Sequence, residues 1–137
     1  MADLTITAAN VIAQGGASKS NADAGEAITA GEALAKDSSG DLVLASDASA
    51  TLAAVVGISL NEGAAGQPID YHTGGDINMG ATLAVGKHYC LSTDGAIAPV
   101  DDIAGSEFPT YIGYAISTSI LRVQILKATV AAAGAVS

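Results

Sequence analysis

Residues 31–45 read GEALAKD-SSG-DLVLA and give the most direct indication of fold class. Two short apolar segments, 31–37 and 41–45, stand on either side of the turn Ser38-Ser39-Gly40. This pattern predicts a β-hairpin, in which Gly40 supplies the positive φ angle of the turn. Gly, Ser and Thr interrupt short apolar stretches along the rest of the chain in the same way, so we expect many short strands and little helix.

Further elements are expected on both sides of this hairpin. The period-two alternation over 4–12 predicts a strand or an extended N-terminal arm. Residues 14–25 hold no large apolar side chain, which predicts a loop or linker. Additional strands are expected at 55–60, 68–72, 111–116 and 121–126.

The second half of the chain repeats the plan of the first half. A shift of 55 residues places Gly40 on Gly95 and predicts a second hairpin, with strands at 87–91 and 96–100 and a turn at 92–95. One inserted residue later, Gly57 meets Gly113. Further along, Ile69 meets Ile125. We therefore predict an internal duplication, because Gly recurs where the backbone needs a conformation closed to other residues.

These patterns together predict a mainly β protein with a compact, hairpin-rich domain of sandwich or barrel type. The domain spans 24–127, with half-repeats at about 24–75 and 79–127. An N-terminal strand or arm and linker, 1–23, precedes it, and an Ala-rich tail, 128–137, follows it. The expected structural turn glycines are Gly31, Gly40, Gly57, Gly86, Gly95 and Gly113.

The charge balance argues against several classes of partner. The 137 residues include five Lys or Arg against 14 Asp or Glu, a formal net charge of −9. Nucleic acids and anionic membranes attract Lys and Arg, so we expect neither as a partner. The single Cys excludes an internal disulfide. Without a long apolar run or a signal-peptide pattern, a soluble chain made in a cytoplasm is expected.

The few residues suited to metal binding leave two interpretations open. His88 and Cys90 lie two apart on an expected strand and would point to the same face. Zinc needs one or two further ligands, for which His72 or Asp70 would have to converge by folding. The simpler interpretation is two ordinary strand histidines and an inert thiol, and we expect no metal and no cofactor.

Other polar residues predict turns and surface pairs rather than catalysis. Asp101-Asp102 fits a solvated turn better than a calcium loop, which needs acids spaced through a defined loop. Residues Asp37, Asp41 and Asp47 fit polar positions around a turn. The single Arg, Arg122, is expected in a surface ion pair. We therefore expect no catalytic residues, no small-molecule substrate and no enzyme activity.

In its hairpin region the chain resembles the capsid decoration, or cement, proteins of tailed double-stranded DNA phages. The resemblance is carried by 31–45, by the acidic Ser/Thr/Ala loop that follows, and by AVVGI at 54–58. MADLTITAAN at 1–10 and TGGDINMG at 73–80 are similar to one small subfamily. A looser likeness to the lambda-type head decoration protein covers roughly 31–75, although this chain adds a second hairpin half and has few aromatic residues.

The resemblance implies a β-rich homotrimer on the outer surface of the expanded capsid, near local three-fold positions. It would bind the major capsid protein, stabilise the virion against the pressure of packed DNA, and reside in the host cytoplasm during assembly. The matching N-terminal stretch would contact the capsid by β-augmentation. Its expected contact residues are Leu4, Thr5, Ile6, Thr7 and Val11. The alternative is a carbohydrate- or surface-binding β-module on a virion or cell envelope.

Overall fold

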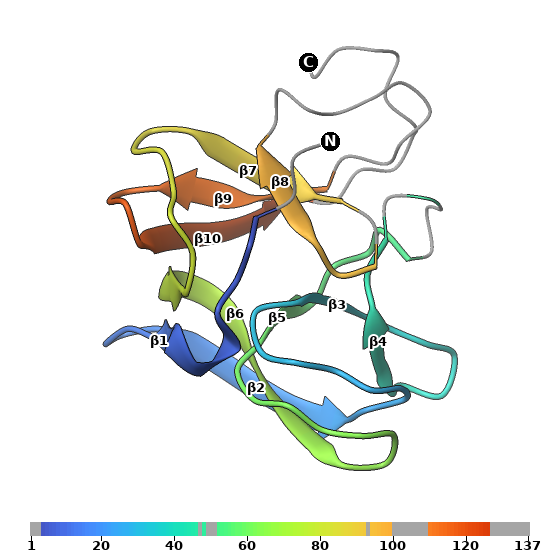
Figure 1. Ribbon diagram of the computed structural model, residues 1–137. Helices are drawn as coiled ribbons and strands as arrows, with labels where there is room; N and C mark the ends of the chain where they lie inside the picture. The colour runs from blue at the N-terminus through green and yellow to red at the C-terminus, as the bar shows by residue number, and fades with distance from the viewer. Residues whose placement is uncertain (1–3, 47, 49–51, 93, 100–109, 127–137) are drawn as a thin grey trace.

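The computed structural model describes residues 4–46, 48, 52–92, 94–99 and 110–126. The described elements are η1 (Ala8–Asn10), β1 (Val11–Ala13), β2 (Ser18–Asp23), β3 (Ala33–Lys36), β4 (Leu42–Leu44), β5 (Gly57–Ser59), β6 (Pro68–Met79), β7 (His88–Leu91), β8 (Ile97–Pro99), β9 (Tyr111–Ala115) and β10 (Ile120–Leu126) (Figure 1). Within these residues no helix has the length and apolar character needed to cross a membrane. The expected mainly β class is confirmed.

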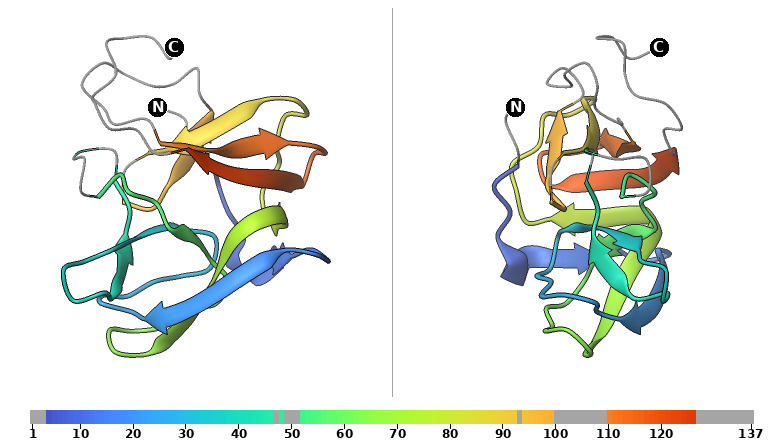
Figure 2. Two further views of the ribbon diagram at one scale, coloured as in Figure 1. Left: turned by 180° about the vertical axis from the view of Figure 1, so that it is seen from behind. Right: turned by 90° about the vertical axis from the view of Figure 1, so that its right-hand side faces the viewer.

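The strands form one antiparallel sheet that curls into a half-barrel (Figure 2). Its order is β4-β3-β5-β6-β10-β9-β7-β8, and β1 and β2 also pair with β6. Along its first part β6 is flanked by β2 and β5, since His72 pairs with both Lys19 and Ile58. Along its second part β1 and β10 flank it, since Ile77 pairs with both Ala13 and Leu121. The strand β6 therefore joins both halves of the fold.

The two halves share their strand order and much of their register. The hairpin β3–β4 and the hairpin β7–β8 match 55 residues apart, with Leu34 in the place of Tyr89. Leu34 pairs with Gly57 on β5 as Tyr89 pairs with Gly113 on β9. That a duplication produced this arrangement remains a prediction.

The expected match between Ile69 and Ile125 is wrong. Ile58 pairs with His72, whereas the equivalent Tyr114 pairs with Arg122, so His72 and Arg122 occupy corresponding positions. The connection from β5 to β6 is longer than that from β9 to β10. After β5, a constant shift in residue number therefore no longer aligns structurally equivalent residues.

The main core lies between the two halves. It gathers buried side chains of both hairpins, of β1, β5, β6, β9 and β10, and of the segments between strands: Val11, Ala30, Ala33, Ala35, Ala45, Ala53, Ile58, Ile77, Met79, Leu83, Tyr89, Leu91, Ile97, Ile112, Ala115, Leu121 and Val123. A smaller core packs on the other face of the first half: Ala24, Ile28, Leu34, Leu42, Ile69 and Tyr71. The first half is thus buried on both faces, which is why its β3 strand, ALAK, carries apolar residues without polar alternation.

The expected extended N-terminal arm is not confirmed, because residues 4–13 pack against the domain. The Leu4 amide donates to the Ile97 carbonyl (2.8 Å) and the Thr7 amide to the Gly80 carbonyl (2.7 Å). Val11 belongs to the main core and is 6% exposed. Strand β1 then pairs with β6. This segment contacts both halves and belongs to the same fold as the described residues that follow it.

The expected linker at 14–25 is wrong over Ser18–Asp23, which form β2. All its side chains are exposed except the half-buried Ala22, so no apolar alternation marks the strand in the sequence. It is held by backbone pairing with β6, from Ser18 opposite Gly74 to Asp23 opposite Pro68. Tertiary pairing, rather than local propensity, makes this segment a strand.

The turn glycines of both hairpins have the expected backbone conformation. Gly40 has φ 84° and Gly95 has φ 82°, values that other residues adopt at a cost. Gly31 and Gly86 also have positive φ. In contrast, Gly57 and Gly113 lie inside β5 and β9 without positive φ, so a turn role for these two is wrong.

Candidate functional site

A polar row crosses four neighbouring strands on the outer face of the second half. Asp76 on β6 lies opposite Arg122 on β10, Arg122 opposite Tyr114 on β9, and Tyr114 opposite His88 on β7. Directly opposed residues point to the same face of a sheet. The next row, Ile77, Leu121 and Ala115, is buried in the main core, so the polar row faces outward.

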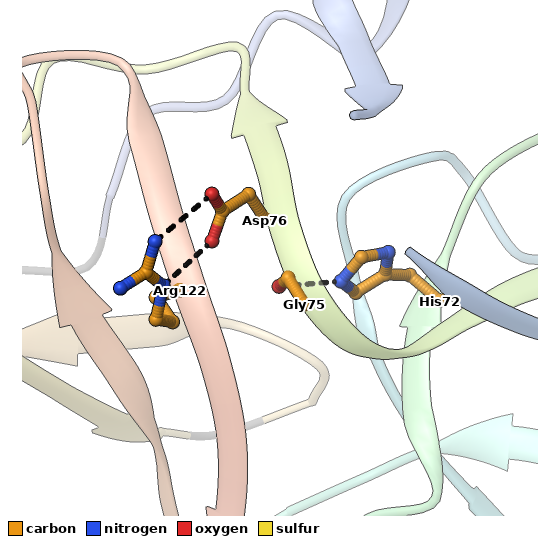
Figure 3. A network of polar contacts seen from close by, with 4 residues as sticks. All are labelled: His72, Gly75, Asp76 and Arg122. Carbon is orange, nitrogen blue, oxygen red and sulfur yellow. Dashed lines mark hydrogen bonds and ion pairs between the residues drawn. The ribbon is translucent and has the colours of Figure 1, made fainter. Parts of the chain in front are cut away.

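Arg122 and Asp76 form a two-point ion pair within this row (Figure 3). Arg122 Nε lies 2.9 Å from Asp76 Oδ1, and Nη2 lies 3.3 Å from Oδ2. The hydrogen bonds from Arg122 hold the pKa of Asp76 below its ordinary value. Hydrogen bonds to Asp76 and to Tyr114 raise the pKa of Arg122, so the guanidinium links two strands on either side of β10.

An aromatic cluster continues the row on β7 and β9. The His88 ring lies between Tyr111 (ring centroids 5.5 Å apart) and Tyr114 (6.0 Å apart). His88 Nδ1 is 2.7 Å from the Tyr111 hydroxyl, which donates when Nδ1 carries no proton. Partial burial raises the pKa of Tyr111, with Tyr114 adding to it. Two of the four tyrosines of the chain therefore meet at one surface.

An apolar row runs alongside the polar one. Asn78 on β6 pairs with Ile12 on β1 and with Ile120 on β10, and the Ile116 amide donates to the Ile120 carbonyl (3.0 Å). Ile12 is 57% exposed and Ile116 is 36% exposed. We refer to both rows together as the outer-face surface: Ile12, Asp76, Asn78, His88, Tyr111, Tyr114, Ile116, Ile120 and Arg122.

The residues considered as possible metal ligands, His72, His88 and Cys90, do not come together. His88 is exposed and bonded to Tyr111, whereas Cys90 is buried and lies 3.6 Å from the Ala98 carbonyl. His72 is fully buried on β6. Within the described parts of the chain, no three His, Cys, Asp or Glu residues are grouped so that they could hold a metal ion.

The remaining sequence candidates fall at scattered positions. The half-buried Leu4 and Ile6 pack on the main core, while Thr5 and Thr7 are exposed. Asp37 caps the first hairpin turn, since its Oδ1 accepts from the Ser39 amide (2.8 Å) and the Asp41 amide (3.0 Å). Asp47, Asp101 and Asp102 lie outside the described residues, as does the tail 128–137.

Two residues of the outer-face surface stood out in the sequence for their chemistry, Arg122 as half of a surface ion pair and His88 as a possible metal ligand. Tyr111 and Tyr114 stand in a predicted strand, and their aromatic rings could have indicated a binding surface from the sequence. That His88 and Asp76 join them depends on the register of β7 and β6, which the local pattern does not specify. No family model matches this sequence, and a search of curated proteins found no match. The surface is therefore interpreted from its own chemistry.

Proposed function

We propose that this chain is a structural virion protein: a homotrimeric decoration protein that binds the outer surface of an expanded phage capsid near local three-fold positions. It would stabilise the shell against the pressure of packed DNA. The sequence resemblance supports the choice of the major capsid protein as partner. The outer-face surface is the structural observation that supports docking to another protein.

The composition of this surface is that of a protein-binding site. Tyr and Arg are enriched among the residues that contribute most to binding between proteins, and here Tyr111, Tyr114 and Arg122 lie together. Ile12 and Ile116 add exposed apolar area beside them. Full burial of such a side chain contributes about 1.5–3 kcal/mol. The polar row would fix orientation while the apolar row supplies affinity.

Weak contacts from one copy suffice when several copies bind together. A trimer that engages neighbouring capsid subunits converts each later contact into an intramolecular one, so its overall affinity exceeds that of a single copy. The formal charge of −9 keeps many copies soluble before assembly. No small-molecule substrate, cofactor or nucleic acid is needed for this role.

The test compares two exposed apolar residues of equal exposure. Ile116 on the outer-face surface is 36% exposed, and Leu52, which borders a hollow with Lys36 and Val43 in the first half, is 37% exposed. Co-sedimentation with expanded heads should fall at least about tenfold for Ile116→Asp, since about 1.4 kcal/mol is a factor of ten. Leu52→Asp should bind as the wild type does. Sedimentation equilibrium should give a trimer.

A monomer with no affinity for expanded heads would contradict the proposal. Equal loss of binding in both variants would contradict the assignment of the outer-face surface. Thermal melting of each variant beforehand ensures that only folded protein is compared.

The cluster of Tyr111, His88 and Tyr114 favours a second candidate function, carbohydrate binding, because half-exposed rings suit stacking on sugars. Glycan-array screening of wild type, Tyr114→Phe and Tyr114→Ala tests it. Binding that survives in the Phe variant and is lost in the Ala variant would support this candidate. An array without reproducible hits would contradict it.

A further inference from the structure

His72 is a fully buried, ionisable residue near the middle of the strand that joins both halves. It is 0% exposed and pairs directly with Ile58 of β5. Ile58 belongs to the main core, and directly opposed residues share a face, so His72 faces the main core as well. A group whose charge changes in mildly acidic solution therefore lies where the two halves meet.

The hydrogen bonding of the ring defines its protonation. Nε2 lies 2.9 Å from the Gly75 carbonyl oxygen (Figure 3). A carbonyl only accepts, so Nε2 carries the proton and Nδ1 of the neutral ring is an acceptor. Nδ1 is buried and has no hydrogen-bond partner in the protein. A second proton would add a buried donor without an acceptor, and a buried positive charge.

The charges around His72 do little to offset this cost. Lys19, directly opposite on β2, repels a positive ring. Asp76 on β6 attracts it, but both carboxylate oxygens of Asp76 already accept from Arg122. Strand β5 contributes Gly57–Ser59, none of which ionises. Burial is the largest influence and lowers the pKa of His72, although the Gly75 carbonyl and Asp76 act in the opposite direction.

The backbone beside His72 can open without exposing much of either core. Ser18 pairs with Gly74 and Lys19 with His72, so Thr73 has no partner on β2 and forms a bulge. Gly75 follows with φ 89°. Strand β2 carries almost no buried side chain, so its separation from β6 exposes little apolar surface. Local opening of such a segment costs less than global unfolding.

We infer that His72 is an acid-sensitive lock on β6: in mildly acidic solution, proton uptake by its ring favours a state in which β2 separates from β6 and the Gly74-Gly75 bend opens. At neutral pH the uncharged ring holds the bend closed through Gly75. This inference concerns the fold itself and is independent of the partner of the outer-face surface.

The direction follows from proton linkage. An exposed histidine takes up its proton near pH 6.5, and the closed state takes it up only at lower pH. The opened state therefore binds more protons below about pH 6.5, and its population rises as the pH falls. Between pH 7.5 and pH 5.5 the equilibrium constant for opening should rise by up to about tenfold, the limit for a ring that stays uncharged in the closed state.

Hydrogen exchange of the full chain at pH 7.5 and pH 5.5, corrected for the intrinsic pH dependence, tests the inference. In the wild type, protection of amides in β2 and 72–76 should fall at pH 5.5, by up to about tenfold, while that of β7 and β9 stays unchanged. His72→Gln should remove this pH dependence. His88→Gln, at the exposed histidine, should retain it.

Equal protection at both pH values in the wild type would overturn the inference, as would the same loss in His72→Gln. If His72→Gln does not fold, ¹⁵N NMR of the wild-type imidazoles provides the decision. An Nε2-protonated His72 that titrates well below the ordinary histidine value of about 6.5 supports the lock. Titration of His72 at about 6.5, with no change in β2 exchange, overturns it.

Discussion

Gly57 and Gly113 occupy corresponding positions in the two halves, and each lies against the backbone of the next strand. A Cβ atom on Gly57 would come within 2.5 Å of the His72 carbonyl oxygen and 2.6 Å of Tyr71 Cδ2. A Cβ atom on Gly113 would overlap the Arg122 carbonyl oxygen. The same close approach thus occurs once in each half.

Gly57→Ala and Gly113→Ala should therefore each lower the free energy of unfolding by about 1–3 kcal/mol, because the neighbouring strand has to move. Gly15→Ala is the control, since a Cβ there would meet no atom within 4 Å and its φ is not positive. Urea unfolding measures all three. A stability of either strand variant equal to that of Gly15→Ala would show that the sheet accommodates the methyl group.

Substitution of the two hairpin-turn glycines should have unequal effects. Both have positive φ, so Gly40→Val should cost about 1 kcal/mol or more. A Cβ on Gly40 would have no neighbour within 4 Å, whereas one on Gly95 would lie 3.1 Å from Leu44 Cδ2 and 3.2 Å from Glu32 Cβ. Gly95→Val should therefore lower the melting temperature further. Equal melting temperatures at matched concentration would contradict this.

The adjacent residues Val11 and Ile12 allow a test of the packed N-terminal segment. Val11 is 6% exposed in the main core, whereas Ile12 is 57% exposed on the outer-face surface. Val11→Ala should lower the free energy of unfolding by about 1–2 kcal/mol through the lost burial, and Ile12→Ala by less than about 0.5 kcal/mol. Thermal melting measures both. A Val11→Ala variant as stable as the wild type would mean that the segment is a free arm and does not pack on the core.

The ion pair between Arg122 and Asp76 predicts a pH dependence at acidic pH. The folded pKa of Asp76 lies below its ordinary value, chiefly because of the hydrogen bonds from Arg122. The contribution of the pair is thus present above the ordinary carboxyl pKa and is lost as the pH falls through the lower, folded one. It should be small, because exposed pairs contribute little.

Arg122→Gln should raise the pKa of Asp76 toward its ordinary value, which a ¹³C NMR titration of the Asp76 carboxyl group measures directly. The carboxyl group of Asp70, an exposed residue on the same strand, provides the reference. An Asp76 titration that is the same in the variant and in the wild type would show that Arg122 does not hold the carboxylate in solution.

Local patterns in the chain specified its strand-rich class and both hairpins. Each hairpin couples short apolar segments to a glycine with positive φ, and such turns form between residues close in sequence. The β3–β4 and β7–β8 hairpins were therefore predictable from a window of about fifteen residues. The predicted match of Gly57 with Gly113 also agrees with the strand pairing. The distance along the chain from each hairpin to this glycine differs by only one residue between the two halves.

The three-dimensional pairing decided everything that depends on contacts between distant strands. Strand β2 is polar and became a strand only by pairing with β6, and the N-terminal segment packs on the core instead of extending from it. The outer-face surface needs the register that aligns Asp76, Arg122, Tyr114 and His88. Similarly, only the tertiary structure makes His72 a fully buried histidine and His88 an exposed one. Side-chain spacing along a strand fixes which residues share a face, but hydrogen bonding across the sheet fixes which residues meet.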